Sequence, residues 1–314
     1  MTLLAEVVRS GYVEGGHHGS VVALHPDGST ALALGSLERP VFPRSSNKPL
    51  QAVGMLDAGW EPASPEQLAL AIASHSGEPG HLEVVRSMLE GIGEQALGTP
   101  PMLPLNEAAA HALLAAGAVA TPLTMNCSGK HAAMLATCQV RGWPLIGYLA
   151  PDHPLQQVIK ATLERLAGEP VRHVAVDGCG APQHALTLPG LARAFARIAR
   201  EDGSLRRTAE AMRSCPWHVG GSGRDVTLLM QGIPGLIAKD GAEGVYAAAL
   251  PDGSAVALKI DDGAGRARTP VLVAALRALG VEAAVLDELA TTPVLGGGRP
   301  VGEVRVVPAL SRLA

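Results

Sequence analysis

Residues 20–35 read SVVALHPDGSTALALG, and residues 244–259 read GVYAAALPDGSAVALK. Each stretch is an apolar run, a Pro-Asp-Gly turn and a second apolar run, which is the pattern of a β-hairpin. One hairpin is therefore expected near the start of the chain and the other near its end. An internal repeat would also explain the likeness between them, although the shared turn is enough to produce it.

The segment between the two hairpins is mainly helical in pattern. An amphipathic stretch follows Pro43, from Arg44 to Gly59, and Ser64 with Pro65 gives the N-cap and first-turn signal of another helix. The remaining predicted elements are helices at 81–93, 106–117, 129–141, 153–167, 189–201 and 204–213, a short strand at 171–176, and a helix at 268–279 that closes the regular part.

These patterns predict an α+β fold with one antiparallel sheet built from both chain ends. The sheet part covers about residues 1–44 and 220–314, and a mainly helical part of about 45–219 is inserted between them, all within a single catalytic domain of residues 1–314. Clear βαβ alternation and a Gly-rich phosphate loop are both missing from the sequence.

Composition narrows the class of protein further. The chain has 314 residues, 47% of them hydrophobic, and a net charge of only −4, which excludes global disorder. Balanced charge and 3% aromatic residues argue against a nucleic-acid partner. Glu6 and Arg9 interrupt the first apolar run, and the apolar stretch 108–123 is too short to span a bilayer. We expect a cytoplasmic protein without a membrane partner, whose cysteines are free thiols.

Ser45 and Lys48 form the first motif whose side chains could take part in catalysis. They lie three residues apart at a predicted helix start, so the amine can reach the hydroxyl. A neutral lysine could take the serine proton, and the positive end of the helix would suit an oxyanion. Taken alone, the pair is explained as well by a serine N-cap and a solvated lysine.

Two further short motifs contain serine or lysine. Ser74-His75-Ser76-Gly77 follows an apolar helix, and its alternative interpretation is a helix C-cap with Gly77 at the turn. Lys239-x-Gly241 directly precedes the late hairpin and resembles the Lys-Thr-Gly element of penicillin-recognising serine enzymes, which also use a Ser-x-x-Lys helix. Lys259 is the rival of Lys239, and a solvent-facing lysine is the plain alternative for both.

Two turns rich in small residues contain the cysteines of interest. The first turn, at the start of a predicted helix, reads Asn126-Cys127-Ser128-Gly129-Lys130-His131. The second reads Asp177-Gly178-Cys179-Gly180, and its cysteine comes fifty-two residues after Cys127. Two thiolates with one nitrogen ligand could bind zinc and leave a position open. His131 is the ordinary nitrogen candidate, whereas Lys130 must first lose a proton. Two buried free cysteines are the commoner explanation of such a pattern.

The chain resembles the class 3 (rhizobial-type) L-asparaginases, the asparaginase II family, along nearly its whole length. The matching runs are Ala5–Gly11, Arg44–Pro49, Ser74–Pro79, Asn126–His131, Asp177–Pro182 and Lys239–Gly244. The resemblance implies a fold akin to serine β-lactamases and glutaminases, a homodimer, and hydrolysis of L-asparagine to L-aspartate and ammonia.

The resemblance also implies roles for individual residues. Two Ser–Lys tandems fall on Ser45 with Lys48 and on Ser74 with Lys239, and a Zn²⁺ site falls on Cys127, Lys130 and Cys179. Arg44, Ser76, His131 and Asp177 are assigned to substrate binding. Ser74 is preferred to Ser76 because it heads the Ser-His pair, and Lys239 to Lys259 because Lys-x-Gly leads into a strand.

Two alternatives remain at this point. One is a different amide hydrolase on the same scaffold, such as a glutaminase or a penicillin-recognising enzyme. The other is a non-catalytic zinc-binding protein, although the scarcity of Trp and Tyr anchors weakens a role in binding partners.

Overall fold

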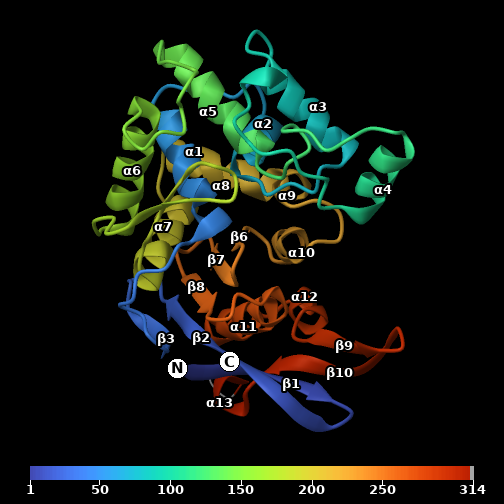
Figure 1. Cartoon of the computed structure of the whole chain (residues 1–314). Helices are drawn as coiled ribbons and strands as arrows, with labels where there is room; N and C mark the ends of the chain where they lie inside the picture. The colour runs from blue at the N-terminus through green and yellow to red at the C-terminus, as the bar shows by residue number, and fades with distance from the viewer. Residues whose placement is uncertain (312–314) are drawn as a thin grey trace.

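A curled antiparallel sheet is the framework of the computed structural model, which describes residues 1–311 (Figure 1). Within those residues the sheet has eight strands, in the order β6-β7-β8-β2-β1-β10-β9, with β3 also paired to β2. The strands are β1 (Thr2–Arg9), β2 (Tyr12–Leu24), β3 (Thr30–Leu34), β6 (Ile237–Gly241), β7 (Val245–Ala249), β8 (Ala255–Ile260), β9 (Thr292–Gly296) and β10 (Arg299–Val306).

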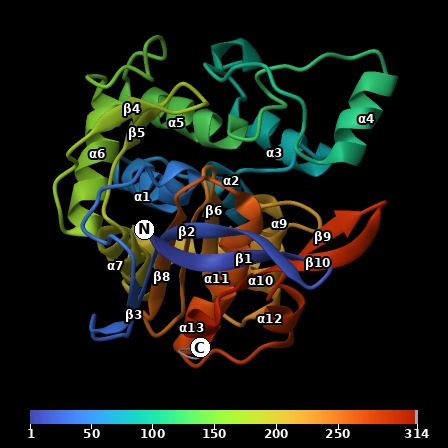
Figure 2. The same ribbon diagram turned by 60° about the horizontal axis from the view of Figure 1, so that its bottom comes forward.

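The long strand β2 joins the two ends of the chain. Its first part pairs with β1, and its last part lies between β3 and β8. β1 in turn pairs with β10, and Figure 2 shows these two strands side by side. The predicted α+β architecture, with one antiparallel sheet made from both chain ends, is therefore confirmed.

Both predicted hairpins are present, as β2–β3 and β7–β8. Gly28 and Gly253 have φ angles of +85° and +94°, a backbone conformation that glycine adopts without strain. Pairing of β2 with β8 places the two hairpins next to each other in the sheet. The prediction that a helix at 268–279 closes the regular part is wrong, because α12 (Ala284–Glu288), β9, β10 and α13 (Pro308–Ser311) follow it.

The predicted helices are all present, with ends that differ by a few residues. They are α1 (Lys48–Asp57, preceded by the 3₁₀ turn η1, Arg44–Asn47), α2 (Pro65–Ile72), α3 (Pro79–Met88), α4 (Glu107–Ala115), α5 (Ser128–Arg141), α6 (Pro154–Ala167), α7 (Leu188–Arg200), α8 (Ser204–Ser214) and α11 (Gly265–Ala278). The remaining helical elements are η2 (Glu94–Ala96), α9 (Pro216–Val219) and α10 (Asp225–Gly232). The expected strand at 171–176 is shorter, as β4 (Val174–Val176), and pairs with β5 (Pro182–His184).

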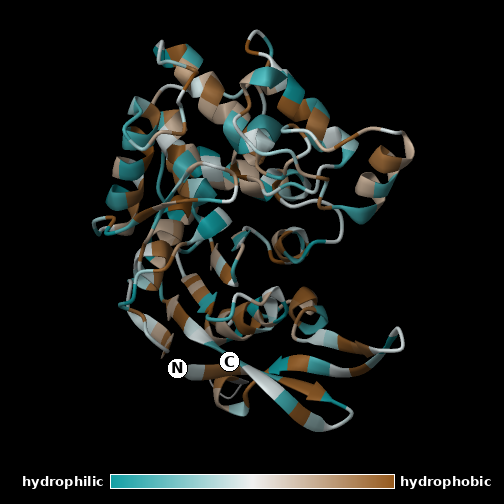
Figure 3. Cartoon of the chain, viewed as in Figure 1, coloured by the Kyte–Doolittle hydropathy of each residue, from teal (hydrophilic) through white to brown (hydrophobic). Residues whose placement is uncertain are grey.

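Helices cover both faces of the sheet. β7 is buried along its whole length and β8 along nearly all of it, with α7 and α11 packed against these strands. The helices α1 to α6 and α8 gather beyond one end of the sheet (Figure 1). In Figure 3 hydrophobic and hydrophilic residues alternate along α3 and α6, as expected of helices buried on one side. In residues 1–311 no helix has the length and apolar character needed to cross a membrane.

Candidate active site

The 3₁₀ turn η1 brings Ser45 to a small cavity beside the edge strand β6. Ser46 donates a hydrogen bond to the Lys239 carbonyl at 2.9 Å, which fixes η1 against β6. Arg44 has φ of +53°, a strained value for a residue with a side chain, and it directly precedes Ser45. Ser45 is partly exposed, and its hydroxyl makes no hydrogen bond within the described part of the chain.

The cavity has a volume of about 180 Å³ and lies between η1, the turn after β4 and the segment before α5. Its lining residues are Arg44, Ser45, Met102, Met125, Asn126, Cys127, Asp177, Gly178, Cys179 and Ala242. Of the residues that the sequence assigns to a site, Lys48, Ser74, Ser76, Lys130, His131 and Lys239 are outside this lining. All six are buried.

Lys48 is buried in the first turn of α1 and makes three contacts. Its Nζ donates to the Ala73 carbonyl at 2.5 Å, to the Ser74 hydroxyl at 3.1 Å and to the Cys127 thiol at 3.1 Å. These three acceptors come from the loop after α2 and from the segment before α5. The structure thus joins Lys48 to Ser74 by a hydrogen bond, whereas Ser45 contributes only its carbonyl, which accepts from the Lys48 backbone N–H.

Ser74 and Ser76 lie on an extended loop that other loops hold in place. α2 ends at Ile72, so Gly77 is not its C-cap as the alternative interpretation of this motif had it. The Ser74 N–H donates to the Val219 carbonyl, and the Ser76 hydroxyl donates to the Gly220 carbonyl at 2.9 Å. The hydroxyl of Ser74 therefore faces Lys48, while that of Ser76 anchors the loop.

Lys239 lies on β6 and is completely buried. Its Nζ donates to the backbone carbonyl of Asp240 at 2.8 Å and to the Asp240 carboxylate at 2.5 Å. Burial lowers the pKa of Lys239 to about 8, with Lys48 and Arg224 acting in the same direction and Asp240 opposing them. The structure shows no hydrogen bond between Lys239 and Ser74 among the described residues.

Lys259 occupies a different place from Lys239. It lies on β8, donates to the carbonyls of Glu243 and Ile260, and lines a separate cavity with Arg39 and Asp261. Of the two rival lysines, Lys239 is the one beside η1 and Lys48.

The cysteine turns meet at the wall of the cavity. Cys127 directly precedes α5, and Lys130 in its first turn donates to the Cys179 thiol at 3.0 Å. A hydrogen bond with Cys179 lowers the pKa of Cys127 well below its usual range, and Lys48 and Lys130 add to this. Both cysteines are buried and free, as expected from the sequence. Burial would lower the pKa of Lys130, but the two thiols outweigh it and raise that pKa.

His131 and Asp177 complete this side of the site. The His131 Nδ1 is 2.7 Å from the Tyr148 hydroxyl, and its buried Nε2 has no partner among the described residues. Burial, with help from Lys130, lowers the pKa of His131 to about 4, so the ring is neutral. Asp177 accepts a hydrogen bond from the Arg44 Nε at 2.7 Å, and Lys130 and Arg44 outweigh the effect of burial and lower its pKa.

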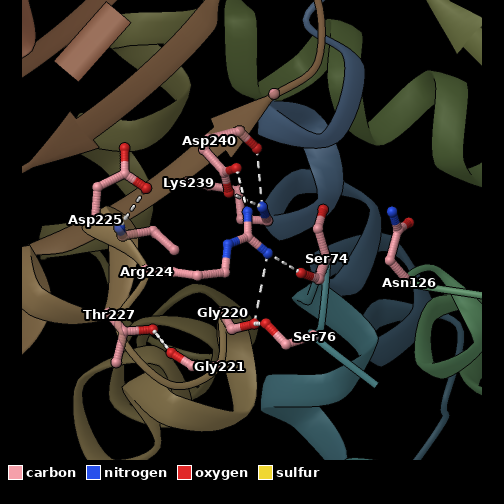
Figure 4. Close-up of polar contacts among 12 residues, drawn as sticks. Ser74, Ser76, Asn126, Gly220, Gly221, Arg224, Asp225, Thr227, Lys239 and Asp240 are labelled. Carbon is pink, nitrogen blue, oxygen red and sulfur yellow. Dashed lines mark hydrogen bonds and ion pairs between the residues drawn. The ribbon is translucent and has the colours of Figure 1, made fainter. Parts of the chain in front are cut away.

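Arg224 and Asp240 belong to this region, although the sequence patterns did not point to them. The Arg224 guanidinium lies between Ser74 and Asp240 (Figure 4), and it donates to the Ser74 carbonyl at 2.5 Å and to the Asp240 carboxylate at 2.6 Å. Asp240 is the middle residue of the Lys239-x-Gly241 motif, and an acidic side chain next to a buried lysine was the available signal.

A partly exposed serine hydroxyl beside a small cavity, with buried lysines and a second serine beneath it, is an arrangement suited to nucleophilic hydrolysis. A search of curated proteins gives no match. The family model described as L-asparaginase II matches residues 5–306. The chain therefore belongs to the L-asparaginase II family, and it is an L-asparaginase, a hydrolase that acts on a linear amide.

Proposed function

We propose that the chain hydrolyses L-asparagine with Ser45 as the nucleophile and Lys48 as its base. The observation that supports this best is the position of Lys48, whose buried amine lies against Ser74 one helical turn from a free hydroxyl in the cavity. Lys48 in its neutral form takes the Ser45 proton as the oxygen attacks the side-chain amide carbon. The tetrahedral oxyanion needs backbone N–H donors near Ser45, each worth about 3 kcal/mol.

Ser74 then protonates the leaving group. Its hydroxyl gives a proton to the departing nitrogen, which leaves as ammonia, and Lys48 returns a proton to Ser74. The net result is transfer of the Ser45 proton to ammonia and an aspartyl ester on Ser45. Lys239 supplies positive potential next to Lys48. In the second half-reaction Lys48 takes a proton from water, the hydroxide attacks the ester, and the proton returns to Ser45.

The cavity wall offers opposite charges to an amino-acid substrate. Arg44 can bind the α-carboxylate, and Asp177 can accept hydrogen bonds from the α-ammonium group. His131 lies behind this wall next to the thiols, so we propose that it supports the pocket. Ser76 is bonded to Gly220 and acts on substrate binding only through the loop it holds.

The residues assigned to zinc fit that ion. The two thiols line the cavity, the Lys130 amine donates to Cys179, and the orphaned Nε2 of His131 lies next to Cys179. Sulfur and nitrogen donors are those that zinc prefers, and binding requires a neutral Lys130. We propose that Cys127, Lys130 and Cys179 would hold the ion, which would order the wall and present positive charge to the bound substrate.

Other parts of the proposal concern architecture. We propose that the fold is akin to serine β-lactamases and glutaminases, since a Ser-x-x-Lys helix start faces an edge strand with Lys-x-Gly. We also propose a homodimer, supported by the family resemblance. Mass determination by light scattering tests the second point, and a monomer at micromolar concentration would contradict it.

An ammonia-release assay tests the function. Asparagine and glutamine are compared on one purified sample whose zinc content is measured, with a β-lactam acylation test alongside. Release from asparagine well above that from glutamine, without β-lactam acylation, supports the proposal. Preference for glutamine would favour the glutaminase alternative, and zinc without any amide hydrolysis would favour the non-catalytic one.

A further inference from the structure

Arg224 connects the Ser74 loop with Asp240 on β6. It directly precedes α10, and its side chain is 22% exposed. Its Nη1 donates to the Ser74 carbonyl and, at 3.5 Å, to the Gly220 carbonyl. Its Nη2 donates to the Asp240 carboxylate. Asp240 in turn holds Lys239. Ser74 and Lys239 are thus linked through one arginine and one carboxylate (Figure 4).

The loop that contains Ser74 depends on such contacts because it has no regular secondary structure of its own. Residues 220–224 are bound to it at several points. The Ser222 N–H and hydroxyl both donate to Glu78, at 2.9 and 2.7 Å, and Ser76 donates to Gly220. Arg224 adds the only charged contact that this segment makes with Ser74 among the described residues. Charge-assisted hydrogen bonds are the stronger kind.

Arg224 also shapes the electrostatic surroundings of Lys239. The charged groups that face Lys239 are Asp240 on its own strand, Lys48 from α1 and Arg224 ahead of α10. Arg268 from α11 faces Asp240 as well, at 3.6 Å. Lys239, Arg224 and Arg268 therefore share the buried Asp240 carboxylate. Arg224 repels the Lys239 ammonium and also weakens the attraction of Asp240 for it.

We propose that Arg224 is a positioning residue for amide hydrolysis: it fixes the Ser74 hydroxyl at Lys48 and limits the negative charge that Lys239 meets. This inference rests on the proposed function of Ser74 and Lys239. It predicts two separable effects of removing the guanidinium. The Ser74 loop becomes less well placed, which slows proton transfer to the leaving nitrogen, and the Lys239 ammonium becomes more stable.

The second effect can be measured without turnover. The chain has five lysines (Lys48, Lys130, Lys160, Lys239 and Lys259), so ¹³Cε-labelled lysine gives a small set of NMR signals, with Lys239 assigned by Lys239→Met. The Lys239 signal is expected to titrate near pH 8 in the unaltered chain. In Arg224→Gln its midpoint rises by about 1 unit. An unchanged midpoint in a folded Arg224→Gln chain overturns the electrostatic half of the proposal.

The first effect is measured as turnover. Arg224→Gln is expected to lower kcat for asparagine by about 10- to 100-fold, with KM changed by less than about threefold, and to move the alkaline limb of the pH profile upward. Arg224→Lys keeps the charge, but its single ammonium cannot bind the Ser74 carbonyl and the Asp240 carboxylate with the geometry of a guanidinium. Its Lys239 midpoint returns toward that of the unaltered chain while kcat stays low. Wild-type kcat in folded Arg224→Gln would overturn the positioning role.

Arg197→Gln is the matched control. Arg197 on α7 also joins a carboxylate, that of Glu201, to a backbone carbonyl, that of Arg165, but it is not part of this site. This control is expected to leave kcat and the Lys239 midpoint unchanged, and thermal unfolding checks every variant. If Arg224→Gln does not fold, a low kcat in folded Arg224→Lys still supports the positioning role, and a wild-type kcat in that variant overturns it. If the unaltered chain releases no ammonia from asparagine, the proposed function fails. The NMR titration then still tests the effect of Arg224 on Lys239.

Discussion

Lys239, which is buried on β6, should make the free energy of unfolding of the chain depend on pH. Its pKa is lowered from 10.5 to about 8 by burial, with Lys48 and Arg224 acting in the same direction and Asp240 against it. Between these two values the unfolded chain binds more protons than the folded chain, so stability rises with pH. The stability gained in this way is complete above pH 10.5 and is lost as pH falls to about 8. A shift of roughly 2.5 units corresponds to about 3 kcal/mol.

Lys239→Met isolates this contribution. Urea unfolding of both chains, followed by tryptophan fluorescence from about pH 7 to about pH 11, gives two stability curves whose difference cancels the other titrating groups. We expect the difference to change by about 3 kcal/mol in favour of the unaltered chain as pH rises across the window. Lys160→Met, on the surface of α6, is the control for loss of a lysine. A flat difference curve for Lys239→Met would mean that Lys239 has the same pKa in the folded and the unfolded chain.

Three further predictions concern the serines and the thiols. Ser45→Ala should reduce ammonia release by at least about 10³-fold without changing the thermal midpoint, since its hydroxyl has no hydrogen-bond partner within residues 1–311; substantial residual turnover would remove Ser45 as nucleophile. Ser76→Ala should cost about 1–3 kcal/mol in urea unfolding because the buried Gly220 carbonyl loses its donor, and no loss of stability would contradict the anchoring role. Treatment of the zinc-loaded chain with a chelator should lower the thermal midpoint of the unaltered chain but not that of Cys179→Ser; equal shifts in both would argue against a site at these thiols.

The parts of the fold with strong local signals could be predicted from the sequence. The Pro-Asp-Gly turns and the capped amphipathic helices depend on neighbouring residues alone, and Ser64 does accept a hydrogen bond from the Gln67 N–H. The β9–β10 hairpin was missed because Gly296, Gly297 and Gly298 with two prolines mask its strands. Its pairing with β1, from the opposite end of the chain, supplies what local propensity lacks.

The site could be predicted only as separate motifs. Serines, lysines and thiols were identifiable, but which lysine meets which serine depends on contacts between residues far apart in sequence. Lys48 is hydrogen-bonded to Ser74, twenty-six residues away, rather than through its side chain to Ser45. Arg224 was equally hidden, since an arginine before a helix is ordinary in sequence, and its importance comes from Asp240 and the Ser74 carbonyl.

Trapping of the covalent intermediate is the decisive test of Ser45 as the nucleophile. Acid quenching of the unaltered chain at short times after mixing with asparagine, followed by peptide mass mapping, shows which side chain becomes acylated. Ser74→Ala, which slows formation of the ester, should show less of it. We expect one aspartyl ester, on the peptide that contains Ser45. An ester on any other residue, or rapid ammonia release with no acyl group at any time after mixing, would contradict it.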